Sequence, residues 1–392
     1  MKALFIHDNM VTVYQNKYYG NGSLTAKTFN RYLNVFDSLT VATRQEIAKD
    51  KNHKGYTPLD TKGVYFEKIP EFSSLSSVVN FLKAKRKICQ LIKEHDIIII
   101  RLPSFNGLLA YNICKKYKKK MIIEVVGYSK DVLKMKGMIG SIIALPFDYL
   151  MKKYVKNAEF VVYVTKEYLQ RQYPTKGKST NASNVNIDTF EKEKYLEKRE
   201  SYTKVNTQSE LVFGSIGDID QLYKGHDKII DVLPKIMKQR NQIIRYELVG
   251  GGSGNYLQPH VKENSLEKNV KFMGSMSQKE VLSWLDTIDI YLQPSLTEGL
   301  PRAVIEAMSR GLVCIGSDRG GIPELLDKSV IIPNIESLQE VEKTIMSVLD
   351  GDLVILSANN WEHSKEYSYD IISKRLLSFY REVVNSSSGL IT

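Results

Sequence analysis

The chain has few cysteines and no long apolar run, and both absences exclude classes of protein. Its 392 residues include three cysteines, Cys89, Cys114 and Cys314. They lie far apart and none has a CxxC partner, so the sequence offers neither a disulfide framework nor a cysteine zinc site. No segment reaches the roughly 18 apolar residues of a membrane-spanning helix, and the first residues do not resemble a signal peptide. These absences predict a protein of the reducing cytoplasm.

Several catalytic motifs are missing as well. The sequence has no Gly-x-Ser-x-Gly and no P-loop, which argues against a hydrolase and a kinase. The turn after the first expected strand lacks Gly-x-Gly-x-x-Gly, which argues against a nicotinamide dehydrogenase. None of the six histidines has a metal-ligand spacing, so we expect no metal and no cofactor. No RNA- or DNA-binding signature is visible either, which makes nucleic-acid binding the weakest of the functions considered.

The chain has an excess of positive charge, and this charge is unevenly distributed. The chain carries a net charge of +11. Residues 1–190 hold 31 basic and 15 acidic residues, a net charge of +16, whereas the remainder holds 24 and 29, a net charge of −5. A basic half of this kind suits an anionic partner, such as an anionic membrane, a phosphorylated substrate or a nucleic acid.

Strand-like and helix-like segments alternate in two series. The first comprises strands at 2–7, 38–43, 63–68, 96–101, 121–126 and 159–165, with helices at 75–94 and 105–118. The second comprises strands at 211–216, 242–249, 269–273, 289–293 and 313–317, with helices at 224–239, 278–285 and 301–310. Such alternation is typical of doubly wound parallel sheets. The sequence therefore predicts two Rossmann-like α/β domains, residues 1–190 and 207–366, facing each other across a cleft where ligands bind.

Residues 132–154 form a separate feature, rich in methionine, isoleucine and leucine with lysines at its ends. One interpretation is an amphipathic segment that lies on an anionic membrane. The other is a helix that packs on its own domain, because any core-facing helix shows the same pattern.

The strongest chemical signal is a pair of carboxylates, Glu298 and Glu306, with seven residues between them. Glu298 precedes an expected helix that starts with Pro301, and Glu306 lies within it. A helix N-terminus with free N–H groups and two carboxylates suits an anion and sugar hydroxyls. The alternatives are structural: Glu306 could form a helix-face ion pair with Arg302 or Arg310, and Glu298 could stabilise the helix N-terminus.

This segment resembles the E-x7-E element of retaining glycosyltransferases of the GT-B fold, family 4 (glycosyl transferases group 1). Further matches occur in order over about residues 209–330, at 214–217, 223–227, 269–274, 289, 294–295, 311 and 320–324. Several ordered matches make this resemblance far more specific than a single glycine cluster. Residues 101–104, 124–127, 163–165 and 183–185 resemble one polysaccharide-assembly branch of that family. The stretch 366–384 resembles the family's C-terminal helix, so we expect residues 367–392 to return to the N-terminal domain.

The resemblance implies a role for each matching residue. Glu298 would hold hydroxyls of the donor sugar and Lys224 would neutralise the diphosphate leaving group, which makes them the expected catalytic pair. Glu306 would hold the ribose hydroxyls. The other donor-binding residues that the resemblance implies are Gly299, Leu300, Pro301, Ser215, Gly250, Gly251, Val270 and Phe272. Family members often carry an arginine just before the phosphate lysine, and residues 215–223 contain no basic residue. His226 could face the phosphate or cap its helix.

The N-terminal domain gives weaker candidates. Gly20 and Gly22 lie in the expected loop after the first strand and would approach the donor phosphates, although Asn-Gly is also an ordinary turn signal. Arg101, Glu124 and Tyr163 are candidates on the acceptor side. Glu124 either substitutes for the histidine that many members have or forms a buried pair with Arg101, and we favour the pair.

The sequence therefore predicts a retaining hexosyltransferase that uses a nucleotide-diphosphate sugar, with UDP favoured over GDP. Its acceptor would be a glycan hydroxyl, carried on a lipid, in capsule, O-antigen or exopolysaccharide synthesis. The protein would be cytoplasmic and peripheral on the inner membrane face. Alternatives are a sugar-nucleotide epimerase or phosphorylase of the same fold, and a non-catalytic nucleotide-sugar-binding partner protein.

Overall fold

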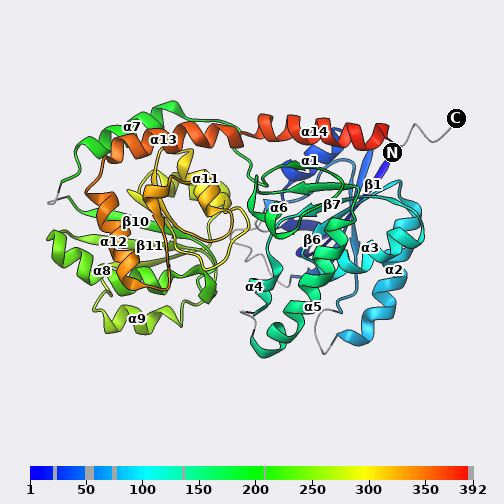
Figure 1. The fold of residues 1–392 in the computed structure, drawn as a ribbon, viewed down its shortest axis with the longest axis horizontal. Helices are drawn as coiled ribbons and strands as arrows, with labels where there is room; N and C mark the ends of the chain where they lie inside the picture. The colour runs from blue at the N-terminus through cyan, green and yellow to red at the C-terminus, as the bar shows by residue number, and fades with distance from the viewer. Residues whose placement is uncertain (21–23, 49–56, 73–76, 135–136, 207–208, 387–392) are drawn as a thin grey trace. The chain divides into compact units, whose positions relative to one another are not determined.

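The computed structural model describes residues 1–20, 24–48, 57–72, 77–134, 137–206 and 209–386. They form two compact units: unit 1 is Met1–Asn186 with the segment from Asp370 onward, and unit 2 is Ile187–Tyr369. Each unit contains a parallel β-sheet with helices around it, as Figure 1 shows. The predicted fold class, two Rossmann-like α/β domains, is confirmed.

Unit 1 is built on a sheet in which seven parallel strands follow the order β5-β3-β1-β6-β7-β8-β9. Its central strand β6 begins with four consecutive isoleucines, Ile97–Ile100, all of them buried. Burial on both faces is what a parallel sheet covered by helices requires. The strands are β1 Lys2–Tyr14, β2 Lys17–Gly20, β3 Ser38–Ile47, β4 Thr57–Pro58, β5 Val64–Lys68, β6 Ile97–Leu102, β7 Lys120–Val125, β8 Phe160–Tyr163 and β9 Lys178–Asn181.

Most helices of unit 1 connect these strands in the βαβ pattern, and α14 joins the unit from the C-terminal part of the chain. They are α1 Ala26–Leu33, α2 Phe81–Glu94, α3 Phe105–Lys116, α4 Ser129–Lys134, α5 Gly137–Lys156, α6 Tyr168–Gln172 and α14 Tyr369–Asn385. The helix predicted over 75–94 begins later than expected. A short 3-10 turn at Val78–Asn80 precedes α2, and residues 75 and 76 lie outside the described residues.

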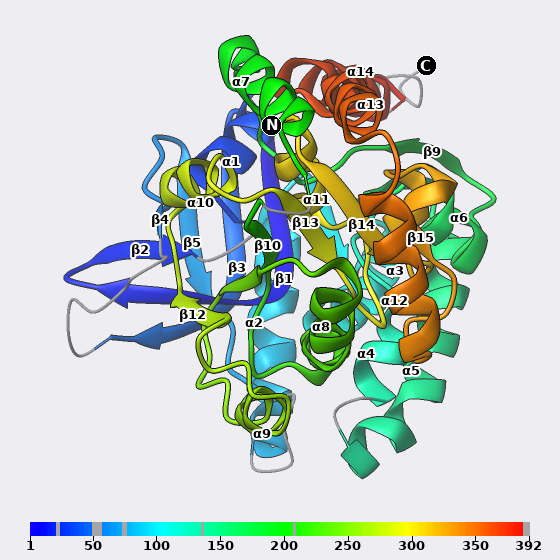
Figure 2. The same ribbon diagram turned by 90° about the vertical axis from the view of Figure 1, so that its left-hand side faces the viewer.

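The loop expected after the first strand was a wrong prediction. β1 continues to Tyr14 and turns back into the antiparallel strand β2 through Gln15 and Asn16, which both have positive φ. Two such residues are what a tight hairpin needs. Figure 2 shows this hairpin, in dark blue, projecting beyond the parallel strands of unit 1. Its β-branched and aromatic residues favoured extension over a loop.

The two glycines assigned to that loop have different outcomes. Gly20 lies at the end of β2, opposite Thr57 of β4. It is buried, and a Cβ there would lie 2.9 Å from the Leu24 carbonyl oxygen. The position therefore requires glycine for packing within unit 1. Gly22 lies outside the described residues.

Unit 2 has a six-stranded parallel sheet in the order β12-β11-β10-β13-β14-β15. Its strands are β10 Leu211–Ile216, β11 Ile244–Val249, β12 Val270–Gly274, β13 Ile290–Gln293, β14 Val313–Ser317 and β15 Ile331–Ile332. Its helices are α7 Lys192–Thr203, α8 His226–Arg240, α9 Leu257–Glu263, α10 Gln278–Leu285, α11 Arg302–Met308, α12 Leu338–Leu349 and α13 Leu353–Ser364. The predicted packing stripe of α11 is buried at Val304, Ala307 and Met308.

Helix α7 lies between the two predicted domain ranges and packs within unit 2. Tyr195 of α7 stacks on Trp361 of α13, with ring centroids 4.6 Å apart. Figure 1 shows α7 and α13 side by side. The stacked ring of Tyr195 therefore attaches the highly charged helix α7 to unit 2.

The C-terminal helix α14 belongs to unit 1, as the resemblance implied. Tyr380 of α14 stacks on Tyr32 of α1, and Phe379 makes an edge contact with Phe160 of β8. Both α14 residues are buried. Among the described residues, no helix is both long enough and apolar enough to cross a bilayer.

Candidate functional site

The candidate donor site lies where the strands of unit 2 end. β10, β11, β12 and β13 are parallel neighbours, so their carboxyl ends share one edge of the sheet, where ligands of open α/β sheets bind. The loops that leave this edge carry the glycine-rich segment after β11 and Glu298 after β13. Lys224 follows β10 and is separated from the start of α8 by Gly225 alone.

Lys224 and Glu298, the expected catalytic pair, are 74 residues apart in sequence and form an ion pair. The Lys224 Nζ lies 2.6 Å from the Glu298 Oε1, and the side chains are 16% and 14% exposed. The carboxylate raises the pKa of Lys224 against the opposing effect of burial, so the lysine is a cation at neutral pH. A fixed positive charge thus stands at the edge of the sheet, in a site partly shielded from water.

Two neutral side chains complete the environment of Glu298. The Ser295 hydroxyl donates to Glu298 Oε1 at 2.9 Å, and the Gln293 Nε2 donates to the same oxygen at 3.1 Å. The Tyr291 hydroxyl in turn donates to Gln293 Oε1. The chain of donors fixes one carboxylate oxygen of Glu298. Sequence reasoning missed Gln293 and Tyr291, although their place at the end of a strand beside the motif was a usable signal.

Close backbone packing brings the loops of Lys224 and Glu298 together. Gly225 has a φ of +70°, and a Cβ there would lie 2.1 Å from the Pro294 carbonyl oxygen. The Leu296 N–H donates to the Tyr223 carbonyl oxygen at 2.8 Å. Any side chain at position 225 would separate the two loops, so this glycine is a condition for the ion pair.

A second glycine, Gly320, lets the segment after β14 pack against the loop that carries Glu298. Gly320, with a φ of +61°, would place a Cβ 2.1 Å from the carbonyl oxygen of Glu298. The Gly321 N–H donates to the Gly299 carbonyl oxygen at 2.7 Å. Gly299 and Leu300 are partly exposed next to this contact, whereas Pro301 is buried and precedes the first residue of α11. The helix therefore starts one residue later than the sequence predicted.

The glycine-rich loop after β11 is fixed by a carboxylate that sequence reasoning overlooked. Asp220 accepts hydrogen bonds from the Ser253 N–H, the Ser253 hydroxyl and the Gly254 N–H at 2.8 to 3.0 Å. These donors lower the pKa of Asp220. Asp218 and Asp220 form an Asp-x-Asp triplet, so a metal motif was visible in the sequence. Here Asp220 is occupied by the loop, and the described residues contain no cluster suited to a metal.

Gly250 stands where that loop leaves β11. A Cβ on Gly250 would lie 1.7 Å from the Gly217 carbonyl oxygen, so the ends of β10 and β11 approach as closely as glycine allows. The neighbouring Gly251 is exposed. Val270 of β12 is buried, and Phe272 is partly exposed beside Gly254. Gly250, Gly251 and Phe272 lie toward the carboxyl edge with Lys224, whereas Val270 is the first residue of β12 and lies opposite Tyr246 of β11.

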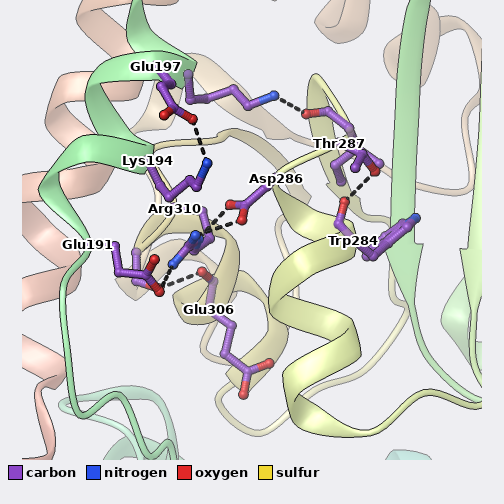
Figure 3. Close-up of polar contacts among 11 residues, drawn as sticks. Glu191, Lys194, Glu197, Trp284, Asp286, Thr287, Glu306 and Arg310 are labelled. Carbon is purple, nitrogen blue, oxygen red and sulfur yellow. Dashed lines mark hydrogen bonds and ion pairs between the residues drawn. The ribbon is translucent and has the colours of Figure 1, made fainter.

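Glu306 does not form the helix-face ion pair that was its structural alternative. Figure 3 shows the carboxylate of Glu306 pointing away from Arg310. Arg310 instead pairs with Asp286 through Nε and Nη2, at 2.6 and 2.7 Å, and with Glu191 at 2.8 Å. Its guanidinium therefore links residues at the ends of α7, α10 and α11, and it is not available to Glu306.

Burial raises the pKa of Glu306, and the nearby charge of Arg302 lowers it by less. No hydrogen bond to the Glu306 carboxylate occurs within the described ranges. A carboxylate that is half-buried without a hydrogen-bond donor costs stability. Such an arrangement is expected where a ligand supplies the missing donors.

Two other residues near the edge face the interior. Ser215 is buried and its hydroxyl donates to the Leu292 carbonyl oxygen at 2.7 Å. His226 is buried at the start of α8, with Nδ1 3.2 Å from the Tyr246 hydroxyl. Burial and the charge of Lys224 lower the pKa of His226 to about 3, so it is neutral. Neither side chain lies with Glu298.

In unit 1, Arg101 and Glu124 form the buried pair that we favoured. The Arg101 Nε lies 3.0 Å from the Glu124 Oε2. The other carboxylate oxygen accepts hydrogen bonds from the Tyr32 hydroxyl at 2.7 Å and the Tyr380 hydroxyl at 2.6 Å. Arg101 also donates to Asn184 at 3.0 Å. The pair lies at the ends of β6 and β7 and links the sheet to α1 and α14.

Tyr163 lies at the end of β8 and is buried. Its hydroxyl donates to the Tyr173 carbonyl oxygen at 2.6 Å. The acceptor-side candidates Arg101, Glu124 and Tyr163 therefore come from three adjacent strands of the unit 1 sheet. Their side chains are interior ones in this structure.

Known proteins resemble the chain in sequence and in fold. Residues 197–366 match the family described as glycosyl transferases group 1. Protein CapJ of Staphylococcus aureus is 33% identical over 394 residues, covering 98% of this chain and 97% of that protein. The amylovoran biosynthesis glycosyltransferase AmsK of Erwinia amylovora is 38% identical over 103 residues, covering 24% of this chain and 25% of its own length.

Solved structures share the two-domain fold at low sequence identity. Sucrose-phosphate synthase from Thermosynechococcus elongatus has a TM-score of 0.70 at 14% identity and covers 98% of this chain and 99% of its own. Anabaena HepE in complex with UDP-glucose has a TM-score of 0.65 at 16% identity and covers both chains in full. The fold and the sequence together define a GT-B glycosyltransferase. The chain belongs to glycosyl transferases group 1.

Proposed function

We propose that the protein transfers a hexosyl unit from a UDP-sugar to a hydroxyl of a lipid-linked glycan, with retention at the anomeric carbon, in capsule, O-antigen or exopolysaccharide synthesis. The observation that carries the proposal is the Lys224–Glu298 ion pair at the carboxyl edge of the unit 2 sheet. The names CapJ and AmsK support a role in polysaccharide assembly. UDP-glucose bound to HepE, a protein of the same fold, supports the choice of UDP.

In this proposal catalysis comes from fixed charges and positioning. Lys224 neutralises the negative charge that develops on the departing diphosphate, and its position requires no reorganisation during the reaction. Glu298 orients donor sugar hydroxyls through the oxygen that the Lys224, Gln293 and Ser295 donors leave open. Glu306 accepts hydrogen bonds from the ribose hydroxyls. The reaction would proceed without a metal, and a chelator would leave the rate unchanged.

Nucleotide binding is predicted to depend on Glu306. We expect UDP to raise the melting temperature of the wild type and the Glu306→Ala variant to lose that shift, because two charge-assisted hydrogen bonds of about 1.5–3 kcal/mol each disappear. Glu340→Ala, on α12, is the control and should keep the shift. Differential scanning fluorimetry with UDP, GDP, ADP and their sugars measures it. An unchanged UDP shift in Glu306→Ala contradicts the ribose assignment.

The same carboxylate predicts a pH dependence in the free protein. Because folding raises the pKa of Glu306 above 4.5, the folded state binds this proton more tightly than the unfolded chain does. Stability from this group is therefore present at low pH and lost as the pH rises through the raised pKa. Glu306→Gln, which stays neutral, should melt at a higher temperature than the wild type at pH 7, and the difference should shrink toward pH 4.5. Equal melting temperatures of Glu306→Gln and the wild type at pH 7 would show that the charge of Glu306 costs the folded protein no stability.

Turnover separates the proposal from its alternatives. Wild-type enzyme with UDP-sugar and a lipid-linked acceptor should release UDP and a glycosylated acceptor of retained anomeric configuration, as detected by NMR. An epimerised donor or a sugar phosphate would identify a different enzyme of this fold. Tight donor binding without any product in acceptor extracts would identify a non-catalytic partner.

A further inference from the structure

Helix α5 of unit 1 exposes an apolar face. Its buried side includes Gly140, Ala144, Phe147 and Met151. The opposite side exposes Met138, Ile139, Ile142, Leu145 and Tyr149, whose exposed fractions are 82%, 57%, 68%, 61% and 66%. We call these five residues the α5 stripe. Their spacing places them on one side of the helix.

The α5 stripe is larger than the scattered apolar residues that a protein surface normally shows. Isolated exposed apolar side chains need no explanation, but a contiguous group of large ones marks an interaction surface. The interpretation that this segment packs on its own domain is confirmed for one face of the helix, and membrane binding stays a prediction. α5 packs on its own domain with one face and presents a second apolar face outward.

The charged side chains that α5 exposes are all basic, while Asp131 of the neighbouring α4 is partly exposed. Lys134 at the end of α4 and Lys153 and Lys156 at the end of α5 are exposed. The single acidic residue of α5, Asp148, is buried and accepts a hydrogen bond from Tyr173 at 2.9 Å. α5 therefore exposes no carboxylate. The half of the chain that holds it carries a net charge of +16.

A second exposed apolar group lies at the start of α2. Val79 and Leu82 are 79% and 62% exposed, and the lysines and arginine that follow, Lys83, Lys85 and Arg86, are exposed too. Figures 1 and 2 both place the beginnings of α2 and α5 toward the same end of unit 1. Two apolar contacts, each with basic neighbours, thus point to one flat and anionic partner.

We propose that the α5 stripe and the start of α2 form the surface through which this protein binds an anionic lipid bilayer. Apolar side chains enter the boundary between headgroups and acyl chains, and the lysines contact the lipid phosphates. A second copy fits less well, because it would bring the lysines of one α5 against those of the other, and α5 exposes no carboxylate to pair them. The proposal deepens the proposed function by naming the surface that brings the enzyme to a lipid-linked acceptor.

The position of this surface agrees with that role. β7 ends at Val125 and α4 begins at Ser129, so the α4–α5 segment directly follows the carboxyl edge of the unit 1 sheet. The Arg101–Glu124 pair lies at that same edge. A bilayer bound at α5 would hold a lipid-linked glycan close to the acceptor-side candidates.

Co-sedimentation with vesicles tests the proposal. Wild-type protein should sediment with phosphatidylcholine vesicles that contain phosphatidylglycerol, and much less with phosphatidylcholine alone or at high salt. The double variant Met138→Ser/Ile142→Ser should bind at least about tenfold more weakly, since it lacks two of the apolar side chains that enter the bilayer. Lys153→Glu/Lys156→Glu should lose the preference for anionic vesicles. Ile355→Ser, which replaces an apolar residue of α13 that is 56% exposed, is the matched control and should bind like the wild type.

Three outcomes would overturn the proposal: no binding of the wild type at low salt, equal binding by the stripe variant, or a dimer in solution that the stripe variant abolishes. The UDP-induced thermal shift is measured on every variant. It should be unchanged, which shows that the variants are folded and that unit 2 is intact. Loss of vesicle binding with a normal UDP shift therefore tests the membrane surface alone, whereas a missing UDP shift in the wild type would refute the donor proposal and leave the vesicle result standing.

Discussion

Replacing Lys224 with alanine is expected to slow sugar transfer about 10²–10³-fold, the range found when one preorganised charge or donor is removed from an active site. The lysine is cationic and lies 2.6 Å from Glu298, so its removal takes away the only positive charge that the described structure places against that carboxylate. Glu298 keeps its hydrogen bonds from Gln293 and Ser295. The loop should therefore stay folded, and the loss should fall mainly on kcat.

The control for this experiment comes from the same helix region. Lys235 of α8 pairs with Glu342 and its side chain is 61% exposed, and Lys235→Ala should transfer sugar at the wild-type rate. Melting curves of both variants exclude misfolding. Initial rates of UDP release at saturating donor and acceptor give the comparison. A Lys224→Ala enzyme within about threefold of the wild type would remove this residue from the mechanism, since a loss that small is under 1 kcal/mol of transition-state stabilisation.

Replacing Glu124 with alanine is expected to lower the free energy of unfolding by about 3–5 kcal/mol, the cost of breaking a buried ion pair on one side. Arg101 would keep its charge in the interior of unit 1, where its side chain is 2% exposed. The hydroxyls of Tyr32 and Tyr380 would also lose their acceptor. Since Tyr380 lies on α14, hydrogen exchange along that helix should accelerate together with the drop in stability.

Urea denaturation and hydrogen exchange measure this effect. Glu159→Ala removes an exposed glutamate next to β8 and should change stability by less than about 0.5 kcal/mol. Tyr380→Phe removes one hydroxyl and should cost about 0.5–1.5 kcal/mol. If Glu124→Ala and Glu159→Ala unfold at the same urea concentration, the pair does not anchor α14.

Some features were predictable because they depend on residues that are near one another in sequence. The isoleucines of β6 predict a strand covered on both faces, and the apolar spacing of α11 predicts the face that packs. The Glu298-to-Glu306 spacing and the ordered glycines predict the family. The sequence does not predict the β1–β2 hairpin, because a tyrosine- and asparagine-rich stretch is typical of loops as well; the positive φ values of Gln15 and Asn16 that form its tight turn appear only in the structure.

The sequence alone determined the fold class, the family and the identity of the residues that carry charge. Local periodicity is enough for the fold class, since helices and strands bury faces with fixed repeats, and the family follows from the resemblance of the ordered motifs. Only the tertiary structure decided which partners those charges have. Arg310 pairs with Asp286 and Glu191 instead of Glu306 because α7 and α10 pack beside α11, and Lys224 meets Glu298 because Gly225 lets two distant loops touch. Likewise, the pattern of α5 was compatible with burial or exposure, and the packing of one face left the other outside.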